Sequence, residues 1–137
     1  HCDAASLREV LARGAEVERA YAQTVQRLGP LVADGIGKMA QTSIGQWKEA
    51  SGEWSVVANH ASELWSVSQQ VNAVEAMTFF TGLHSFLAIV MEQRVMLPAS
   101  QFKKVETRLR SMPLLIEAWA ESGRRERGAI QALLPAA

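Results

Sequence analysis

The stretch that decides the fold of this 137-residue chain runs from residue 40 to residue 71 and reads AQTSIGQWKEASGEWSVVANHASELWSVSQQV. Apolar and small residues recur in it at alternating intervals of three and four, a period of 3.5 residues. They are Ala40, Ser43, Trp47, Ala50, Trp54, Val57, Ala61, Leu64, Ser68 and Val71. A free surface helix drifts off such a repeat, whereas a helix packed lengthwise against a partner keeps it. The stretch therefore predicts an elongated antiparallel coiled coil.

Helical spacing continues on both sides of this stretch. The first helix can be capped by Asp3 or Ser6, and we expect it to end at Gly29 and Pro30. A long second helix is expected to kink at Pro98. No run alternates apolar and polar residues for long enough to indicate a strand, so we predict one all-α domain of three helices. The expected domain covers residues 1–137, with helices over about 4–28, 31–97 continuing kinked to 111, and 113–134.

The segment from residue 74 to residue 97 is apolar around most of its helical circumference. Between residues 61 and 98 only four side chains are charged. A helix that is apolar on most sides must be covered on most sides, and a chain with so few helices offers little cover. We therefore expect a homodimer. The expected dimer-interface residues are Trp54, Leu64, Phe79, Phe80, Leu83, Phe86 and Val90.

The composition excludes several classes of protein. Hydrophobic residues make up 48% of the chain, which is enough to fold. Cys2, the single cysteine, cannot form an internal disulfide, so a disulfide-stapled secreted fold is excluded. The longest mostly apolar stretch, residues 83–97, is shorter than the roughly 20 residues that cross a bilayer. Charged residues interrupt the start of the chain before a signal peptide could form, so we expect a cytoplasmic protein, soluble or peripheral on a membrane.

The charge of the chain is zero overall but unevenly distributed. Lys plus Arg number 14 and Asp plus Glu number 14, so no attraction of the whole chain to nucleic acid is expected. Residues 99–137 hold seven basic and four acidic side chains, a net charge of +3. The basic ones could neutralise lipid phosphates, and the alternative is an ordinary solvated helix face. These candidate lipid-binding residues are Lys103, Lys104, Arg108, Arg110, Arg124, Arg125 and Arg127.

No motif for catalysis or for a metal or cofactor site is recognisable. His60 and His84 fall on different predicted helices without the paired spacing of metal ligands, and His60 with Glu63 is the nearest match. No Gly-rich phosphate loop follows a strand, and no nucleophile lies in a known motif. Three of the four tryptophans, all but Trp65, keep the helical register and are expected in the core. We therefore predict a protein that is not an enzyme and holds no cofactor or metal.

Four strings in order resemble the BAR domains of sorting nexins. They are LREVLARGAEVERAYAQTVQRLG (7–29), QWKEASGEWSVVANHASELW (46–65), FFTGLHSFLAIVMEQRVML (79–97) and FKKVETRL (102–109). The features that match the layout of that family are Gly29 at a helix tip, the aromatic stretch 79–86, Gln93, Arg94, Lys103, Lys104, Glu106 and Arg108. The resemblance implies a curved antiparallel homodimer that binds phosphoinositide-containing endosomal membranes and stabilises tubules for cargo sorting and intracellular protein transport.

The leading hypothesis is thus a non-enzymatic, BAR-like scaffold that binds and senses curved anionic membrane as a homodimer. Two alternatives remain open. One is a phasin-like coat, in which amphipathic helices lie on a granule surface by apolar contact. The other is a helical sensor bundle whose tryptophans line a small-molecule pocket.

Overall fold

The computed structural model describes residues 3–92 and 97–135, apart from the side chain of Ile44. Cys2, Gln93 and Arg94, which entered the sequence analysis, lie outside the described residues. Within the described ranges all regular structure is helical, which confirms the all-α prediction. The helices are α1 (Ala4–Gln41), α2 (Ile44–Trp47), α3 (Ser51–Gln70), α4 (Val74–Met91) and α5 (Ala99–Ala132).

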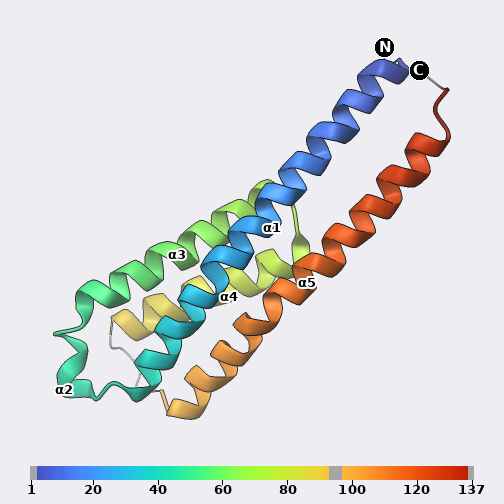
Figure 1. Cartoon of the computed structure of the whole chain (residues 1–137). Helices are drawn as coiled ribbons and strands as arrows, with labels where there is room; N and C mark the ends of the chain where they lie inside the picture. Colours follow the sequence, from blue (N-terminus) through green and yellow to red (C-terminus); the bar gives the residue numbers. More distant parts are fainter. Residues whose placement is uncertain (1–2, 93–96, 136–137) are drawn as a thin grey trace.

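The helices form an elongated bundle built on one long antiparallel pair. α1 and α5 run side by side along their length, so the two ends of the chain lie close together (Figure 1). α3 and α4 form a shorter antiparallel hairpin that packs against one half of this pair. That half is a four-helix bundle. The other half, residues 4–20 of α1 with residues 121–132 of α5, is a two-helix extension that we call the arm.

The prediction that the first helix ends at Gly29 and Pro30 is wrong. α1 starts at the cap formed by Asp3, whose carboxylate accepts a hydrogen bond of 2.8 Å from the Ser6 backbone N–H, and continues through Pro30 to Gln41. An internal proline costs a helix about 3 kcal/mol. The turns beyond it bury Val32, Ala33, Ile36 and Met39 to 0 or 1% exposure, and this burial offsets the cost.

The expected long second helix is divided into separate helices. α3 ends at Gln70, and Asn72 adopts a left-handed conformation with φ of 54° that reverses the chain into α4. Asparagine tolerates this conformation better than most residues. α5 begins after Pro98, so the expected kink there is a helix boundary. The expected break at Pro113 is also wrong, because α5 runs through it as a single helix.

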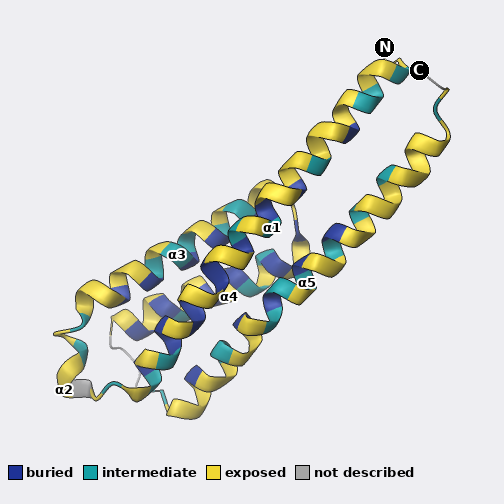
Figure 2. Ribbon diagram, in the orientation of Figure 1, coloured by how far each residue is buried: buried dark blue, intermediate teal, exposed yellow. Residues whose placement is uncertain are grey.

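The core joins all four long helices and covers one face of the apolar helix α4 from within the chain. α4 buries Phe80, Leu83, Leu87 and Val90 beneath α3 and α5 (Figure 2). Five of the seven residues expected at a dimer interface are only 0 to 4% exposed in the single chain. They are Trp54, Leu64, Phe80, Leu83 and Val90. The inference that these side chains need a second copy to cover them is therefore wrong.

The remaining two expected interface residues, Phe79 and Phe86, are half-buried against the same core. The Phe79 ring lies 5.5 Å from that of Phe80, and the Phe86 ring lies 5.5 Å from that of Phe102 on α5. Both are edge-to-face contacts, which aromatic pairs prefer. The aromatic stretch that pointed to a dimer thus joins α4 to the rest of the bundle.

By length and composition alone, α4 would also pass as a membrane span among the described residues. The sequence analysis overlooked this window because it measured the later stretch 83–97. The core helix of a soluble protein passes the same test, so one such helix is weak evidence. Its buried face packs on α3, and its other faces carry exposed Thr78 and Ser85 together with exposed Val74, Ile89 and Met91.

Helices α1 and α3 approach closely at Gly35. A Cβ at this position would overlap the side chain of Val57 on α3, so glycine is required by the contact. Gly128 on α5, in contrast, has open space around it. Alanine normally stabilises a helix interior by about 1 kcal/mol relative to glycine.

We expect Gly35→Ala to lower the free energy of unfolding by about 1–3 kcal/mol, because overpacking forces α1 and α3 apart. The matched control Gly128→Ala should leave it unchanged or raise it by up to about 1 kcal/mol. Chemical denaturation followed by circular dichroism measures both. Equal stability of the two variants would contradict the close approach.

The end of the α3–α4 hairpin is fixed to α1 by a buried hydrogen bond. Tyr21 of α1 and Ser68 of α3 are 3% and 0% exposed, and their hydroxyl oxygens lie 2.6 Å apart. The Tyr21 ring also meets Trp119 of α5 edge-to-face at 5.4 Å. Burial raises the pKa of the Tyr21 hydroxyl above its usual value of 10.0, since the charged form is poorly solvated there, and the bond to Ser68 opposes this.

Because the folded pKa is the higher one, the stability linked to Tyr21 is present below pH 10 and is lost as the pH rises through the folded value. Tyr21 is the single tyrosine, so the ultraviolet absorbance of tyrosinate reports it alone. We expect its titration midpoint in the native protein to lie above that in the urea-unfolded chain. Coincident midpoints would contradict the buried environment.

Candidate membrane-binding site on α5

All seven candidate lipid-binding residues lie on α5, but in two groups with different surroundings. Lys103, Lys104, Arg108 and Arg110 lie in its first three turns, beside the four-helix half. Arg124, Arg125 and Arg127 lie in the arm. Among the described residues α5 packs mainly against α1 and more lightly against α4, and its outer surface is exposed in both places.

The first group is exposed and only partly neutralised. The side chain of Lys103 is 74% exposed, with its Nζ 3.7 Å from Glu106. Arg110 donates to Asp34 of α1 at 2.8 Å and to Glu106 at 3.0 Å, and the hydrogen bond to Asp34 is the main reason that the Arg110 pKa is raised. Exposed charge pairs of this kind are worth about 1 kcal/mol or less.

Lys104 and Arg108 are the least neutralised members of this group. They are one helical turn apart, so they share a face of α5. Lys104 is exposed and makes no ion pair with any residue that the structure describes. The Arg108 guanidinium lies 5.9 Å from the centre of the Phe79 ring and donates to Ser111 at 3.5 Å. Neither contact removes its positive charge.

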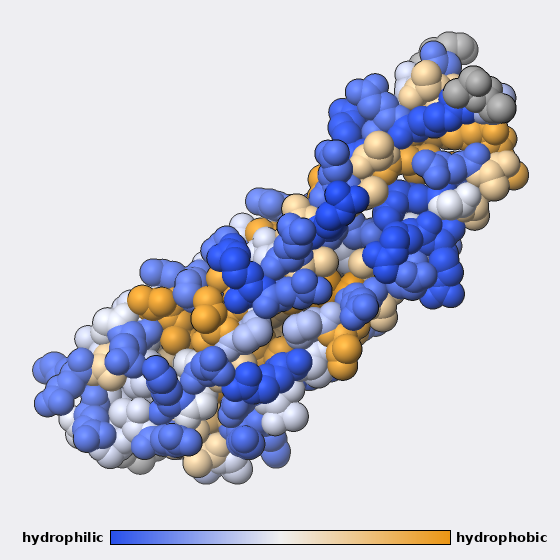
Figure 3. Space-filling view, in the orientation of Figure 1, coloured by the Kyte–Doolittle hydropathy of each residue, from blue (hydrophilic) through white to orange (hydrophobic). Residues whose placement is uncertain are grey.

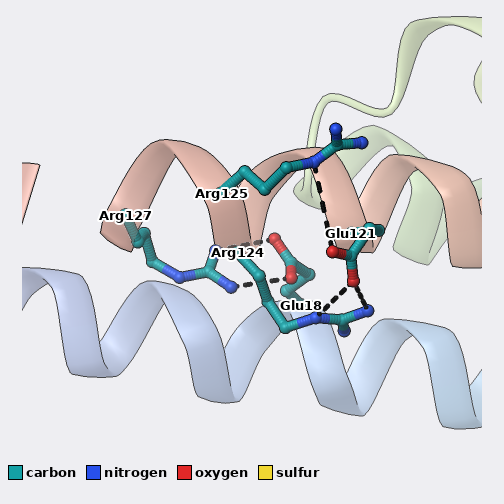
Figure 4. Close-up of polar contacts among 5 residues, drawn as sticks. All are labelled: Glu18, Glu121, Arg124, Arg125 and Arg127. Carbon is teal, nitrogen blue, oxygen red and sulfur yellow. Dashed lines mark hydrogen bonds and ion pairs between the residues drawn. The ribbon is translucent and has the colours of Figure 1, made fainter. Parts of the chain in front are cut away.

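The second group is neutralised within the arm (Figure 4). Arg124 donates its Nε–H to Glu121 at 3.0 Å, and Arg125 lies 4.0 Å from the other oxygen of the same carboxylate. The hydrogen bond from Arg124 is the main reason that the pKa of Glu121 is lowered. This carboxylate offsets one of the two guanidinium charges, and Glu126 beside them in the sequence offsets the other, so no net charge is left for a lipid phosphate.

Arg127 is a structural residue rather than an accessible one. Its guanidinium donates two hydrogen bonds, at 2.7 and 2.8 Å, to the two oxygens of Glu18 on α1. The side chains are only 18% and 10% exposed. Hydrogen bonding to Glu18 raises the pKa of Arg127.

This ion pair fits because residue 123 is glycine. A Cβ on Gly123 would overlap the Glu18 carboxylate and crowd Arg127. The sequence analysis missed the pair, since Glu18 and Arg127 are 109 positions apart. One signal in the sequence could have indicated it. Glu18 is charged, yet it occupies a core position in the apolar stripe of the first helix, seven residues from both Leu11 and Val25.

The tryptophan-lined pocket of the sensor hypothesis is not favoured by the geometry. Trp47 and Trp54 pack against each other with ring centres 5.3 Å apart. Beside them is an open groove of about 480 Å³ lined by Lys38, Gln41, Thr42, Gln46, Glu49, Ala50, Glu53 and Trp54. The Trp54 indole N–H lacks a hydrogen-bond partner among the described residues, yet it is fully buried, so a molecule in the groove would not reach it.

The histidines weighed as metal ligands have other neighbours. Glu63, which follows His60 at the spacing noted in the sequence, lies 3.8 Å from Arg27 of α1. His84 stacks on Trp65 with ring centres 5.4 Å apart. Within residues 3–92 and 97–135, no three His, Cys, Asp or Glu side chains gather in a way that could hold a metal ion.

Comparison with known proteins adds no assignment. No family model, no curated protein and no solved structure matches this chain.

We expect Glu18→Gln to lower the free energy of unfolding by about 1–3 kcal/mol, because it leaves the largely buried Arg127 without its charged partner. The control is Glu16→Gln on the same helix, an exposed position where the change should cost less than about 0.5 kcal/mol. Urea denaturation measures the difference. Equal effects at the two positions would show that the ion pair does not hold α1 to α5.

Proposed function

We propose that this protein is a non-catalytic helical scaffold that binds anionic membrane surfaces through the first three turns of α5. The observation that carries the proposal is the exposed group Lys103, Lys104, Arg108 and Arg110, accompanied in those turns only by Glu106. Lys103 and Lys104 are exposed, whereas Arg110 reaches Asp34 of α1 and Arg108 lies over the Phe79 ring of α4. Lys104 and Arg108, one helical turn apart, are the pair that a flat or gently curved surface could contact together.

The affinity expected for an anionic membrane follows from the strength of each charge contact. A basic side chain near an anionic bilayer contributes about 1 kcal/mol, and Arg110 contributes less because Asp34 and Glu106 already bind it. Three to four such contacts give a dissociation constant on the order of millimolar for one copy. Useful binding therefore requires more than one copy on the membrane, which supports a dimeric scaffold.

The resemblance to sorting nexin BAR domains supports the same role. From it we propose a cytoplasmic protein, peripheral on endosomal membranes, with phosphoinositides as the anionic lipid. A curved dimer is part of this proposal. The kinked three-helix coiled coil that the resemblance implies is not part of the proposal, because α3 and α4 form a hairpin in this chain.

A phasin-like coat is the second candidate, and exposed apolar side chains on the arm favour it. Val10 and Val17 of α1 are 50% and 54% exposed, and Leu133 near the end of α5 is 85% exposed. Contact with an apolar granule would bury them. This binding would not weaken in salt, whereas attraction between charges would.

The test is sedimentation with vesicles that contain phosphatidylserine or a phosphoinositide. We expect Lys104→Gln/Arg108→Gln to weaken binding by about ten- to thirtyfold, since two contacts of about 1 kcal/mol are lost. The control Arg124→Gln/Arg125→Gln removes the same charge from the same helix and should weaken binding less than about threefold. Wild-type binding should fall in high salt.

Three results would contradict the proposal. One is an absence of wild-type binding to anionic vesicles, and another is an equal loss in the two double variants. The third is salt-insensitive adsorption to neutral phosphatidylcholine vesicles, which would favour the coat instead. Circular dichroism of each variant confirms that it is folded.

A further inference from the structure

The arm is joined by less buried side-chain surface than the rest of the bundle. In its α1 segment only Leu11 and Glu18 are buried, at 9% and 8% exposure, and in its α5 segment no residue is buried. Figure 3 shows hydrophobic surface between the two helices of the arm, towards its tip. Apolar side chains stabilise a contact in proportion to the area that they remove from water. The arm is therefore held closed by less hydrophobic burial than the four-helix half.

One ion pair provides the most enclosed contact between the two helices of the arm. In the α5 segment of the arm, Gly123 and Arg127 are the two positions that are not exposed, and both lie against Glu18 of α1. Nearer the tip, Arg8 donates a hydrogen bond to the backbone oxygen of Pro135. That bond is exposed, so water competes for both of its groups. Closure of the arm thus depends mainly on the ion pair.

The two segments of the arm are weak helices without each other. They are about five and three turns long, and most of the stability of such helices comes from tertiary packing. Gly14 lies in one segment, and Gly123 and Gly128 lie in the other. Each glycine lowers the helix propensity, because it loses more backbone freedom on folding than any other residue. A segment that leaves its partner therefore loses much of its helical structure.

Tight packing resumes at the root of the arm. Tyr21, three residues after Glu18, is 3% exposed, bonds to Ser68 of α3 and meets the ring of Trp119 of α5. From this level onwards α3 also covers the α1–α5 pair, and Val25 is fully buried. The contacts that hold the four-helix half together lie beyond the arm, so that half can stay folded when the arm is open.

We propose that the arm opens as a unit while the four-helix half stays folded, and that the Glu18–Arg127 ion pair is the latch that keeps it closed. In the closed arm each of the two charges depends on the other, because a largely buried charge without a partner is costly. In the open arm water solvates both. Loss of this one contact therefore frees both segments together, which distinguishes the opening from gradual fraying of the chain ends. The proposal does not depend on membrane binding.

The test is hydrogen–deuterium exchange of the full chain without lipid, followed by mass spectrometry of its peptic fragments. Exchange rates are corrected for the intrinsic rate of each sequence. We expect amides of the arm, in residues 8–20 and 121–132, to exchange at least about tenfold faster than those of residues 25–36 and 104–116. Both regions are helical, so the difference reports opening of the arm.

Variants on either side of the latch test its role. Glu18→Gln should accelerate exchange in the arm by about five- to a hundredfold, which corresponds to the loss of stability expected for this variant above, and change exchange in residues 25–36 less than about twofold. The exposed control Glu16→Gln should change neither. Gly14→Ala, whose Cβ meets open space, should slow exchange in the arm by up to about fivefold, because alanine favours the helix.

Equal protection of the arm and the four-helix half would overturn the proposal. So would an equal acceleration of both halves by Glu18→Gln, since the arm and the core would then open together. An unchanged exchange rate of the arm in Glu18→Gln would show that the ion pair is not the latch. Because no lipid is present, each of these results is separate from the outcome of vesicle binding.

Discussion

The structure depends on the lengthwise antiparallel packing of α1 against α5. The deepest part of the core comes from this pair, where Val25, Leu28 and Val32 of α1 and Leu109 and Met112 of α5 are fully buried. Proline is tolerated inside each helix because this burial outweighs the loss of one backbone hydrogen bond per proline. The α1–α5 pair is longer than the α3–α4 hairpin, and the arm is the part of the pair that extends beyond the hairpin.

In the arm, which fewer helices cover, α1 and α5 are joined by an ion pair for which Gly123 leaves room. In the four-helix half, hydrophobic side chains fill the space between α1 and α5, but in the arm Glu18 and Arg127 take a core position. An ion pair that bridges two helices fixes their register, since each charge is costly to bury alone. Gly123 provides the space for it. The arm is therefore a defined structure, although it is covered on fewer sides.

The seven basic residues of α5 show how tertiary contacts redistribute charge that looks uniform in the sequence. Four of them lie on the open surface of the bundle beside a single acidic residue of their own helix, whereas three are bound by Glu18 and Glu121. With Asp34 and Glu106 the first group keeps a formal charge of +2, whereas with Glu18, Glu121 and Glu126 the second group has none. Arg124 and Arg125 are bound by Glu121 of their own helix, and Arg127 is bound by Glu18, which comes from the opposite end of the chain.

The sequence by itself determined the all-α class, because its apolar residues recur at helical spacing and no strand pattern competes. The spacing also shows which face of each helix is apolar. Most of the core follows from this, including Trp54 and the buried residues of the repeat around it. The sequence did not determine where helices end. Pro30 and Pro113 would break isolated helices, and only burial of the following turns keeps them helical.

Only the tertiary structure decided what covers the apolar helix α4. Periodicity shows that a surface must be covered, but it does not distinguish a second copy from another part of the same chain. The turn at Asn72, where one left-handed residue reverses the direction of the chain, brings α3 and α4 together and places them on α1 and α5. Apolar surface stays exposed both in the arm and on the outer face of α4, where Val74 is 59% and Ile89 44% exposed, because long-range packing sets how far one hairpin reaches along another.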